Sequence, residues 1–475
     1  MTIARRGCPN RLAGIMPLLL VFSIAIIAAG CGGSAPGTGT TPTPSATPQI
    51  KAQVKIGDAP AARVVSFEVA VGPITLTDDA GKVVNVLAKT QRVELSHLSG
   101  TNEPLSVLNV PQGTYKSASV TVSNPEVTFI NSSGQTQKIE PTFNQSVAIN
   151  FSPSLLIGGS SVIMSIDVNV ANSLAADAQG NITGVNLRAS SFSLSSFPVA
   201  REDKQGHDDG ELEDMIGTVT ALNGTSFNLT ASATGAQLTF ATDSKTEFED
   251  GASLASLAVN SIITVEGSTL SDGSLYARKI EGIENENGSE AEGLITSVTG
   301  SPATALTFVA DHGTGSGVDS STIGETATSD VSNARFEVKT GDIDTNSLGN
   351  LPSSEFPFDS SSVHAGQRVE VESRNAMTSM TVSAEKVRLQ QQALVGTVSG
   401  LSGSNSSGPA TFTLALPADA AFSILAGTST IHVLWQPGTD LHGLTAVSNG
   451  DSIRVRGLVF FNGTTAMMIA RRIDK

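Results

Sequence analysis

The chain has 475 residues, a formal net charge of −16 and an aromatic content of 4%. This acidity argues against nucleic-acid binding, because a phosphate backbone needs a basic protein face. The length is sufficient for several domains, and a chain dominated by Ser, Thr, Val, Gly and Asn is typical of exported all-β modules.

The N-terminal segment has the pattern of a secretory signal peptide. Basic residues, among them Arg5, Arg6 and Arg11, precede or border an apolar stretch at residues 15–29. A membrane-spanning helix needs about 20 apolar residues, so this stretch is short for a span. A basic start followed by a short apolar run is typical of an export signal, and we expect residues 1–30 to be removed.

Cys31 directly follows the small residues Ala28, Ala29 and Gly30. This arrangement resembles the lipobox of bacterial lipoproteins, although Ala28 stands where leucine is commoner. The resemblance implies cleavage before Cys31, a diacylglycerol on its sulfur and acylation of the new amino group, which would anchor the chain to a membrane. A plain signal peptide, or an uncleaved anchor with an incidental cysteine, is the alternative. Gly32 stands where an aspartate would retain such a lipoprotein at the inner membrane, so the outer membrane or cell surface is expected.

A tether and a first folded domain are expected next. Residues 31–50 are rich in Gly, Ser, Thr and Pro, a composition that cannot bury enough apolar surface to fold. The segments 64–77 and 114–122 then alternate apolar and polar residues with a period of two, as half-buried strands do. We expect a β-sandwich at residues 51–200.

Two acidic segments divide the remaining chain, and we interpret both as solvated linkers. The first is 201–214 and the second spans 281–292, with the linker proper at 282–291. A metal site in the first is the weaker alternative, because a flexible charged run does not fix ligand geometry. Its candidate ligands are His207, Asp208, Asp209 and Glu211.

A second weak metal candidate lies in the sequence GDIDTNSLG. Asp342, Asp344 and Asn346 alternate as in a calcium loop, but Ser347 stands where the sharp turn needs glycine and no glutamate closes the loop. No metal site is therefore expected in this chain.

The part after residue 214 repeats itself three times. Each copy opens with a glycine and an aliphatic residue, later shows a strand such as NSIITVEG, GQRVEVES or GDSIRVRG, and closes on a strand such as LYARKIEG. We expect repeats at 215–281, at 292–389 with a Ser/Thr/Gly-rich insertion near 311–332, and at 393–475. Small units with one apolar stripe per strand favour nearly closed, OB-like β-barrels.

Local signals complete this all-β prediction. Asn-Gly and Asp-Gly pairs supply the positive φ that tight hairpins need. These pairs are Asn223-Gly224, Asp272-Gly273, Asn449-Gly450 and Asn462-Gly463. The clearest helix candidate is short, residues 251–259 with Asp250 as its cap.

Both folded parts resemble families of unknown function. The three repeats resemble the bacterial domain of unknown function 5666, with its G-x-[VI] opening, Phe strand and terminal A..I strand; the second copy departs most, with Glu372-Ser373 where the others have glycine. The segment 51–197 resembles domain of unknown function 4382 through IGDAP, ITLTDDAGKVVNVL, VELSHL and LNVPQGTYKSASVTVSNPEV. Its Pro-x-Gly-Thr-Tyr turn also occurs in transthyretin-like sandwiches, where we expect Tyr115 to pack inward. These resemblances imply an exported lipoprotein module and supply no catalytic residues.

The sequence contains no recognisable catalytic or cofactor motif. Its six histidines show neither HExxH nor His-x-His spacing, and neither a nucleophile elbow nor a phosphate-binding glycine loop occurs in a strand–helix setting. We therefore expect a non-catalytic protein without cofactor that acts at the cell envelope as a binding or scaffold module.

Two more specific functions remain as alternatives. One is a carbohydrate-binding surface lipoprotein, in which Trp435 would be the sugar platform; a core position is the commoner role of a lone tryptophan. The other is an assembly or stalk subunit of an envelope complex. The expected partners are the membrane, through lipid on Cys31, and envelope proteins or polysaccharide.

Overall fold

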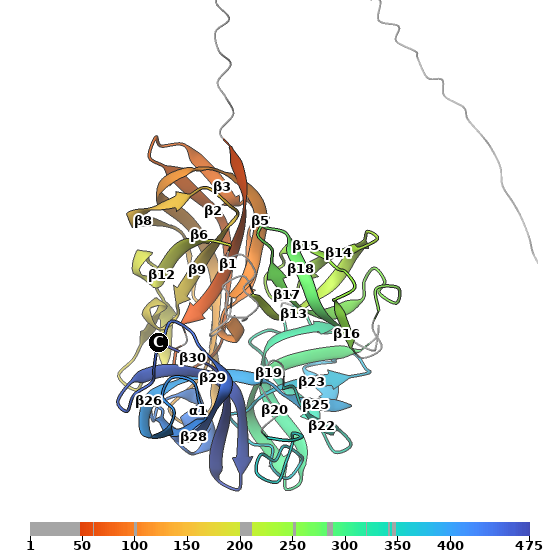
Figure 1. The fold of residues 1–475 in the computed structure, drawn as a ribbon. Helices are drawn as coiled ribbons and strands as arrows, with labels where there is room; N and C mark the ends of the chain where they lie inside the picture. Colours follow the sequence, from red (N-terminus) through yellow and green to blue (C-terminus); the bar gives the residue numbers. More distant parts are fainter. Residues whose placement is uncertain are drawn as a thin grey trace, which may run out of the picture. The chain divides into compact units, whose positions relative to one another are not determined.

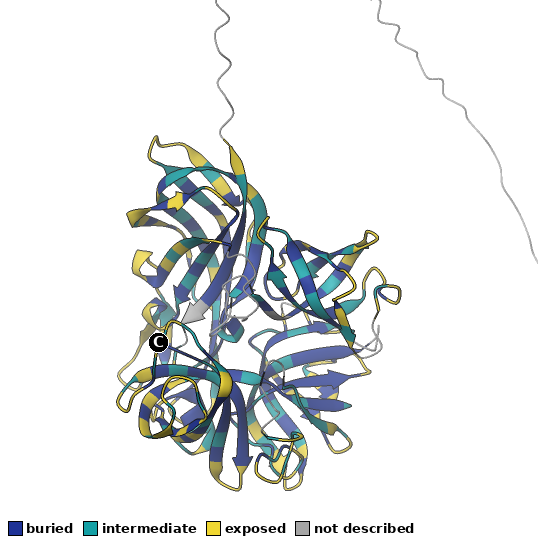
Figure 2. Ribbon diagram, viewed as in Figure 1, coloured by how far each residue is buried: buried dark blue, intermediate teal, exposed yellow. Residues whose placement is uncertain are grey.

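The computed structural model describes residues 48–59, 61–98, 102–199, 211–249, 253–282, 288–319, 321–340, 343 and 348–475 (Figure 1). All of them belong to one compact unit, Thr47–Lys475. Cys31 and the predicted signal peptide lie outside the described residues. The described part is almost entirely β, which confirms the predicted class, and Figure 2 shows buried residues along the strands and exposed residues at the turns.

The N-terminal domain is a β-sandwich. One sheet has the order β12-β9-β1-β5, and the other has the order β3-β2-β6-β7 with β4 on β2 and β8 on β6. Its elements are β1 (Gln49–Ala59), β2 (Val64–Asp78), β3 (Val83–Leu87), β4 (Gln91–Glu94), η1 (Ser96–Leu98), β5 (Asn102–Pro111), β6 (Gly113–Ile130), β7 (Thr136–Ile139), β8 (Asn144–Ile157), β9 (Val162–Asn169), η2 (Ala171–Ser173), β10 (Leu174–Ala176), β11 (Ile182–Val185), η3 (Ala189–Ser191) and β12 (Phe192–Pro198).

The two sheets share one hydrophobic core, to which alternate residues of β6 such as Ala118, Val120 and Val122 contribute. Tyr115 is 1% exposed and its hydroxyl donates a 2.7 Å hydrogen bond to the carbonyl of Pro111. The predicted inward packing of this ring is therefore confirmed, and the turn at Pro111 has a structural role.

Three repeat units follow the sandwich. The first contains β13 (Glu211–Leu222), β14 (Ser226–Ala231), β15 (Gln237–Ala241), β16 (Glu247–Glu249), β17 (Ile262–Thr269) and β18 (Leu275–Gly282). The second contains β19 (Ser289–Gly300), β20 (Ala303–Gly315), β21 (Thr326–Asp330), β22 (Arg335–Val338), β23 (Arg368–Ser373), β24 (Thr381–Ser383) and β25 (Lys386–Leu389). The third contains β26 (Gln391–Gly403), β27 (Ala410–Ala415), α1 (Ala421–Ala426), β28 (Thr430–Leu441), β29 (Ser452–Asn462) and β30 (Thr465–Asp474).

The units share one strand order. In the third barrel it is β26-β27-β28-β30-β29, closed on itself, with β28 parallel to β30. The first barrel repeats this order as β13-β14-β15-β18-β17, again with a parallel pair, β15 and β18. In the second barrel β24 and β25, separated by two residues, take the place of the fifth strand: β24 pairs with β21 and β25 pairs with β23. The first and third units are therefore five-stranded barrels, and the second, called the second barrel below, is a seven-stranded sheet with the same succession of strands.

The interruption of the fifth strand in the second barrel has a steric cause. Gly267 lies on β17 and Gly457 lies on β29, the fourth strands of the first and third barrels when the short β16 is left out. A Cβ atom added at Gly267 would lie 2.4 Å from the carbonyl oxygen of Tyr276, and one added at Gly457 would lie 2.1 Å from that of Ile469. The fifth strand therefore approaches these glycines more closely than any side chain permits. The second barrel has Ser373 at this position, and its fifth strand is broken next to it.

Three expectations need correction. Residues 253–259 form turns rather than a helix, because the hydroxyls of Ser253 and Ser256 bond to each other and to the local backbone, which competes with helix formation. The helix that does form, α1, has only six residues and carries too weak a periodic signal for prediction. Residues 211–214 belong to β13, and residues 289–292 belong to β19 and are largely buried, so these ends of the two predicted solvated linkers are strands. The predicted insertion near 311–332 also includes the end of β20 and β21.

Candidate functional site

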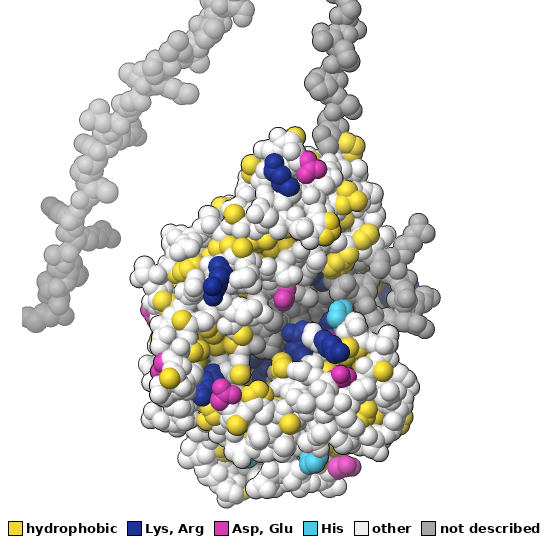
Figure 3. Space-filling view, turned by 90° about the vertical axis from the view of Figure 1, so that its left-hand side faces the viewer, with side chains coloured by type: hydrophobic (Ala, Val, Ile, Leu, Met, Phe, Trp, Pro, Cys, Tyr) yellow, Lys and Arg dark blue, Asp and Glu magenta, His cyan; other side chains and the backbone are white. Residues whose placement is uncertain are grey.

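A cavity of about 370 Å³ is lined by the sandwich and by the second and third barrels. Most of its wall is apolar. The larger apolar side chains in it are Val64 and Val170 from the sandwich, Leu294 from the second barrel, and Leu394, Leu416 and Phe422 from the third. Figure 3 shows a hollow on one face of the molecule, bordered by hydrophobic side chains and by Lys and Arg side chains. The volume and the apolar wall are those of a small-molecule site.

Polar side chains also line this cavity, and two of their oxygen atoms lack a partner. The side-chain oxygens of Gln391 and Gln392 are buried without a hydrogen-bond partner in the described structure. Buried polar groups are normally hydrogen-bonded. A hydrogen-bond donor on a ligand at this point would satisfy these two oxygens.

His97, on η1 at the cavity, is held between two carboxylates. Its Nδ1 lies 2.9 Å from Glu94 Oε2 and its Nε2 lies 3.3 Å from Glu103 Oε1. Burial lowers the pKa of His97, but the hydrogen bonds to Glu103 and Glu94 outweigh burial and raise the pKa to about 10. His97 is therefore a fixed cation at neutral pH.

Asp311, on β20 beside His97, is paired with an arginine of the same barrel. The guanidinium of Arg368 donates to both carboxylate oxygens of Asp311, which is 1% exposed. Burial raises the pKa of Asp311 to about 7 although Arg368 opposes this rise. Asp311 is the extra residue of a β-bulge, since Glu292 pairs with His312 and Gly293 pairs with Ala310. Bulges of this kind redirect a side chain.

His312 behaves in the opposite way to His97. The centroids of the two rings lie 5.1 Å apart. Burial lowers the pKa of His312, and the positive charge of His97 lowers it further, to about 3. His312 is thus neutral at pH 7, and of the two histidines only His97 is positively charged.

Three cationic side chains line the cavity, those of His97, Arg368 and Arg456, together with the carboxylate of Asp311. His97 is paired with Glu94 and Glu103, and Arg368 is paired with Asp311 and Glu292, so these pairs carry no net positive charge. The guanidinium of Arg456 also lines the cavity and is a group that can bind an anionic group of a ligand.

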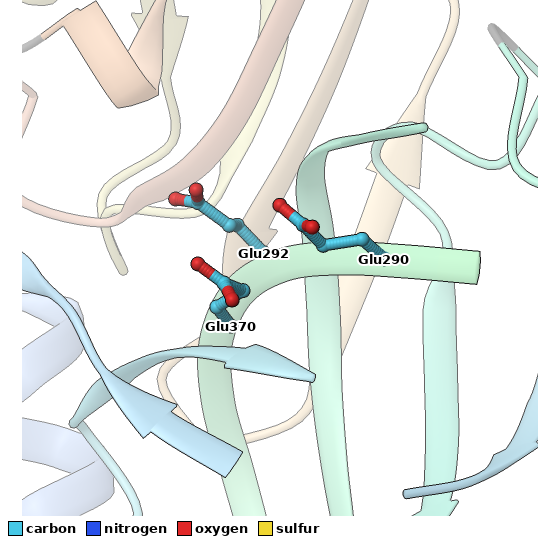
Figure 4. A group of neighbouring side chains, drawn as sticks. All are labelled: Glu290, Glu292 and Glu370. Atoms are coloured by element: carbon cyan, nitrogen blue, oxygen red, sulfur yellow. The ribbon is translucent and has the colours of Figure 1, made fainter. Parts of the chain in front are cut away.

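A group of glutamates lies on the outer face of the second barrel. Carboxylate oxygens of Glu290, Glu292 and Glu370 lie within 4.8 Å of one another, and Figure 4 shows the three side chains pointing to a common region. Burial raises the pKa of Glu370 to about 7 against the effect of Lys339 and Arg388, and burial raises that of Glu290 well above its ordinary value. This group was not among the residues predicted from the sequence, although Glu alternates with apolar residues in SEAEG and RVEVES.

The structure places Trp435 away from any surface. Its side chain is 0% exposed and belongs to the core of the third barrel. A sugar cannot stack on a ring that offers no exposed face, so this position argues against the platform and favours the core interpretation. Cys31, His207, Asp208, Asp209, Asp342, Asp344 and Asn346 lie outside the described residues, and Glu211 pairs with Arg278 at 2.6 Å.

Within the described ranges, no helix has the length and apolar character that a membrane crossing requires.

Comparisons with known proteins confirm the two predicted families and their order along the chain. No curated protein matches the chain. The solved structure titled "drosophila Unr CSD456" is 8% identical and covers 54% of this chain and 95% of its own, but its TM-score of 0.12 is too low to support an argument about fold or function. Residues 50–188 match the family model of the domain of unknown function DUF4382, and residues 216–281 match that of DUF5666. The chain thus contains, in the predicted order, segments of two families to which no function is assigned.

Proposed function

We propose that this protein is a lipid-anchored, non-catalytic binding protein of the cell envelope, and that its cavity holds a small carboxylate with an apolar body. The observation that carries the proposal is the cavity itself, with its apolar wall and the arginine side chains of its polar side. Apolar walls with a few placed polar groups are the usual design of small-molecule sites.

Binding suits this cavity better than catalysis. Both ring nitrogens of His97 are occupied by glutamates, and both carboxylate oxygens of Asp311 are occupied by Arg368. A general acid or base needs a free atom within hydrogen-bond distance of its substrate. Neither His97 nor Asp311 has such an atom free for a substrate in the cavity.

Titration with decanoate tests the ligand class. The protein should bind one decanoate per chain, and the uncharged 1-decanol should bind more weakly because it does not use the positive charge. Arg456→Gln should weaken decanoate binding about tenfold, the effect of losing a charged hydrogen bond of about 1.5 kcal/mol. Arg454→Gln is the matched control, since Arg454 lies two residues away on β29, pairs with Asp474 at 2.7 Å and does not line the cavity.

Equal losses of decanoate affinity in the two arginine variants would contradict the cavity as the binding site. Leu394→Trp gives a second reading, because the larger side chain should fill the cavity and abolish binding while leaving the arginines in place. Retention of the protein on a glycan array, with no binding of decanoate, would instead favour the carbohydrate alternative.

The anchor is tested separately. Cys31→Ser should release the protein from the membrane fraction, because acyl chains on Cys31 supply the proposed attachment. Mass spectrometry of the wild-type N-terminus should show a lipid-modified cysteine. An intact N-terminus or an unmodified thiol would contradict the anchor and leave the cavity proposal untouched.

A further inference from the structure

The strongest feature outside the cavity is a group of glutamates that face one another across two strands of the second barrel. In the antiparallel pair β19–β23, Glu290 lies opposite Glu372, and Glu292 lies opposite Glu370. Like charges directly opposite each other destabilise a sheet. Four glutamates in this arrangement therefore need compensation from outside the pair of strands.

The next strand, β25, supplies cations that pair with the glutamates of β23. On β25, Arg388 lies opposite Glu370 and Lys386 lies opposite Glu372. The Arg388 Nη1 atom is 3.0 Å from Glu370 Oε1, and Lys386 Nζ is 3.1 Å from Glu372 Oε2. The glutamates of β19 are farther from these cations.

Glu292 and Glu290 differ in the partners available to their carboxylates. Glu292 has a 3.4 Å ion pair with Arg368, which is already bound to Asp311 through both carboxylate oxygens. Glu290 is 3% exposed and forms no hydrogen bond or ion pair with any described residue. Its carboxylate points toward those of Glu292 and Glu370 (Figure 4). A buried carboxylate without a partner is costly, and this one lies beside two others.

Negative charge exceeds positive charge in the whole group. Among described side chains, the triad and its ion pairs connect seven carboxylates, those of Glu281, Glu290, Glu292, Asp311, Glu337, Glu370 and Glu372, with four cations, Lys339, Arg368, Lys386 and Arg388. With all seven carboxylates ionised, as cation binding requires, the excess is three negative charges. A bound cation with a charge of two would remove most of it.

We propose that Glu290, Glu292 and Glu370 form a calcium site on the second barrel. The donors are all carboxylate oxygens, which hard cations prefer. The carboxylate oxygens lie within 4.8 Å of one another, close enough to share one cation. Ca²⁺, with ligands about 2.4 Å away and a flexible geometry, suits such a set better than Mg²⁺, which requires a near-ideal octahedron. The buried position also disfavours Mg²⁺, which gives up its water reluctantly. Glu290, Glu292 and Glu370 do not line the cavity, so this site stands apart from the proposed ligand.

Calorimetric titration of the EDTA-treated full-length chain with CaCl₂ tests the site. One Ca²⁺ should bind per chain, with a dissociation constant at or below about 1 mM, the weakest range of extracellular calcium modules. Glu290→Gln and Glu292→Gln should each weaken binding at least about tenfold, because a neutral amide replaces a charged ligand. Glu385→Gln is the matched control: this glutamate belongs to the same barrel and pairs with Arg374 and Arg335 outside the triad, so its loss should leave calcium binding unchanged.

The melting temperature gives an independent reading. Calcium should raise it for the wild type and for Glu385→Gln, but not for Glu290→Gln. Absence of calcium binding by the wild type, with Glu290→Gln melting at or above the wild-type temperature, would overturn the proposal and assign a bound proton to Glu290. Binding of Mg²⁺ at least as tight as that of Ca²⁺ would overturn the choice of ion.

Discussion

The fourth strands of the second and third barrels have matching interior residues and opposite charges outside. Facing the interior, Val369 and Val371 of β23 correspond to Ile453 and Val455 of β29, and all four are at most 1% exposed. Period-two alternation places such residues on one face. The interior of the barrel therefore accounts for the repeat that the sequence shows.

On the outer face, Glu370 and Glu372 of β23 correspond to Arg454 and Arg456 of β29. The glutamates contribute to the acidic group, while Arg456 lines the cavity and Arg454 pairs with Asp474. Corresponding outer positions of a single strand thus carry opposite charges in the two units. Variants at inner and outer positions should separate these two roles.

The largest expected effect belongs to an inner position of the third barrel. Trp435→Ala should lower the free energy of unfolding by about 4 kcal/mol, the usual cost of removing a fully buried tryptophan. Denaturant titration measures this cost, and Trp435→Phe should lose clearly less. A near-normal melting temperature together with lost glycan retention would contradict the core position and restore the sugar platform.

An outer position of the second barrel should have the next largest effect. Arg388→Met should cost about 3 kcal/mol, because it removes one partner from buried charge pairs and leaves Glu370, which is 1% exposed, less compensated. Urea unfolding of Arg335→Met provides the control, since Arg335 is exposed and its pair with Glu385 is long, at 3.9 Å. Equal stability losses in both variants would mean that the acidic group does not depend on Arg388.

This contrast explains how far the sequence could predict the structure. Alternating aliphatic residues and Asn-Gly turns indicate strands, hairpins and the interior of each barrel, and Gly224 and Gly463 adopt the positive φ that their turns predict. The repeat also locates Ser373 as a departure. These features depend on residues that are close in sequence or on adjacent strands. Alternation of apolar and polar residues with a period of two therefore reveals them.

The candidate sites could not be predicted in the same way. Alternation shows that Glu290 and Glu292 share a face, but not that other parts of the protein bury that face; in an acidic run they resemble a solvated linker. His97 acquires its charge from Glu94 and Glu103, whereas its neighbour His312 comes from another domain. Burial between domains leaves no periodic signal in either segment.

A smaller effect should follow when Gly457 of the third barrel is replaced by serine, the residue at the equivalent position 373 of the second barrel. Gly457→Ser should cost about 2 kcal/mol, because the new Cβ would approach the Ile469 carbonyl oxygen and force the fifth strand away. The reverse change, Ser373→Gly, should cost about 1 kcal/mol or less. Thermal unfolding of both variants checks this asymmetry, and equal costs would show that the interrupted strand has another cause.

The pH dependence of stability gives the smallest expected change and compares His97 with the groups of the second barrel that face it. Because its folded pKa is about 10 and its unfolded pKa about 6.5, His97 binds more protons when folded, so its stabilisation is complete below about pH 6.5 and is lost as pH rises toward 10. Asp311, with a pKa of about 7, also destabilises the fold as pH rises, but below pH 7, while His312 acts in the opposite direction between about pH 3 and 6.5. Of these three groups, only His97 titrates between about pH 8 and 9, where its contribution to the slope should be at most about 1.4 kcal/mol per pH unit for one proton. His97→Gln should flatten the slope in this interval, and an unchanged slope would mean that His97 is not protonated in the folded protein at neutral pH.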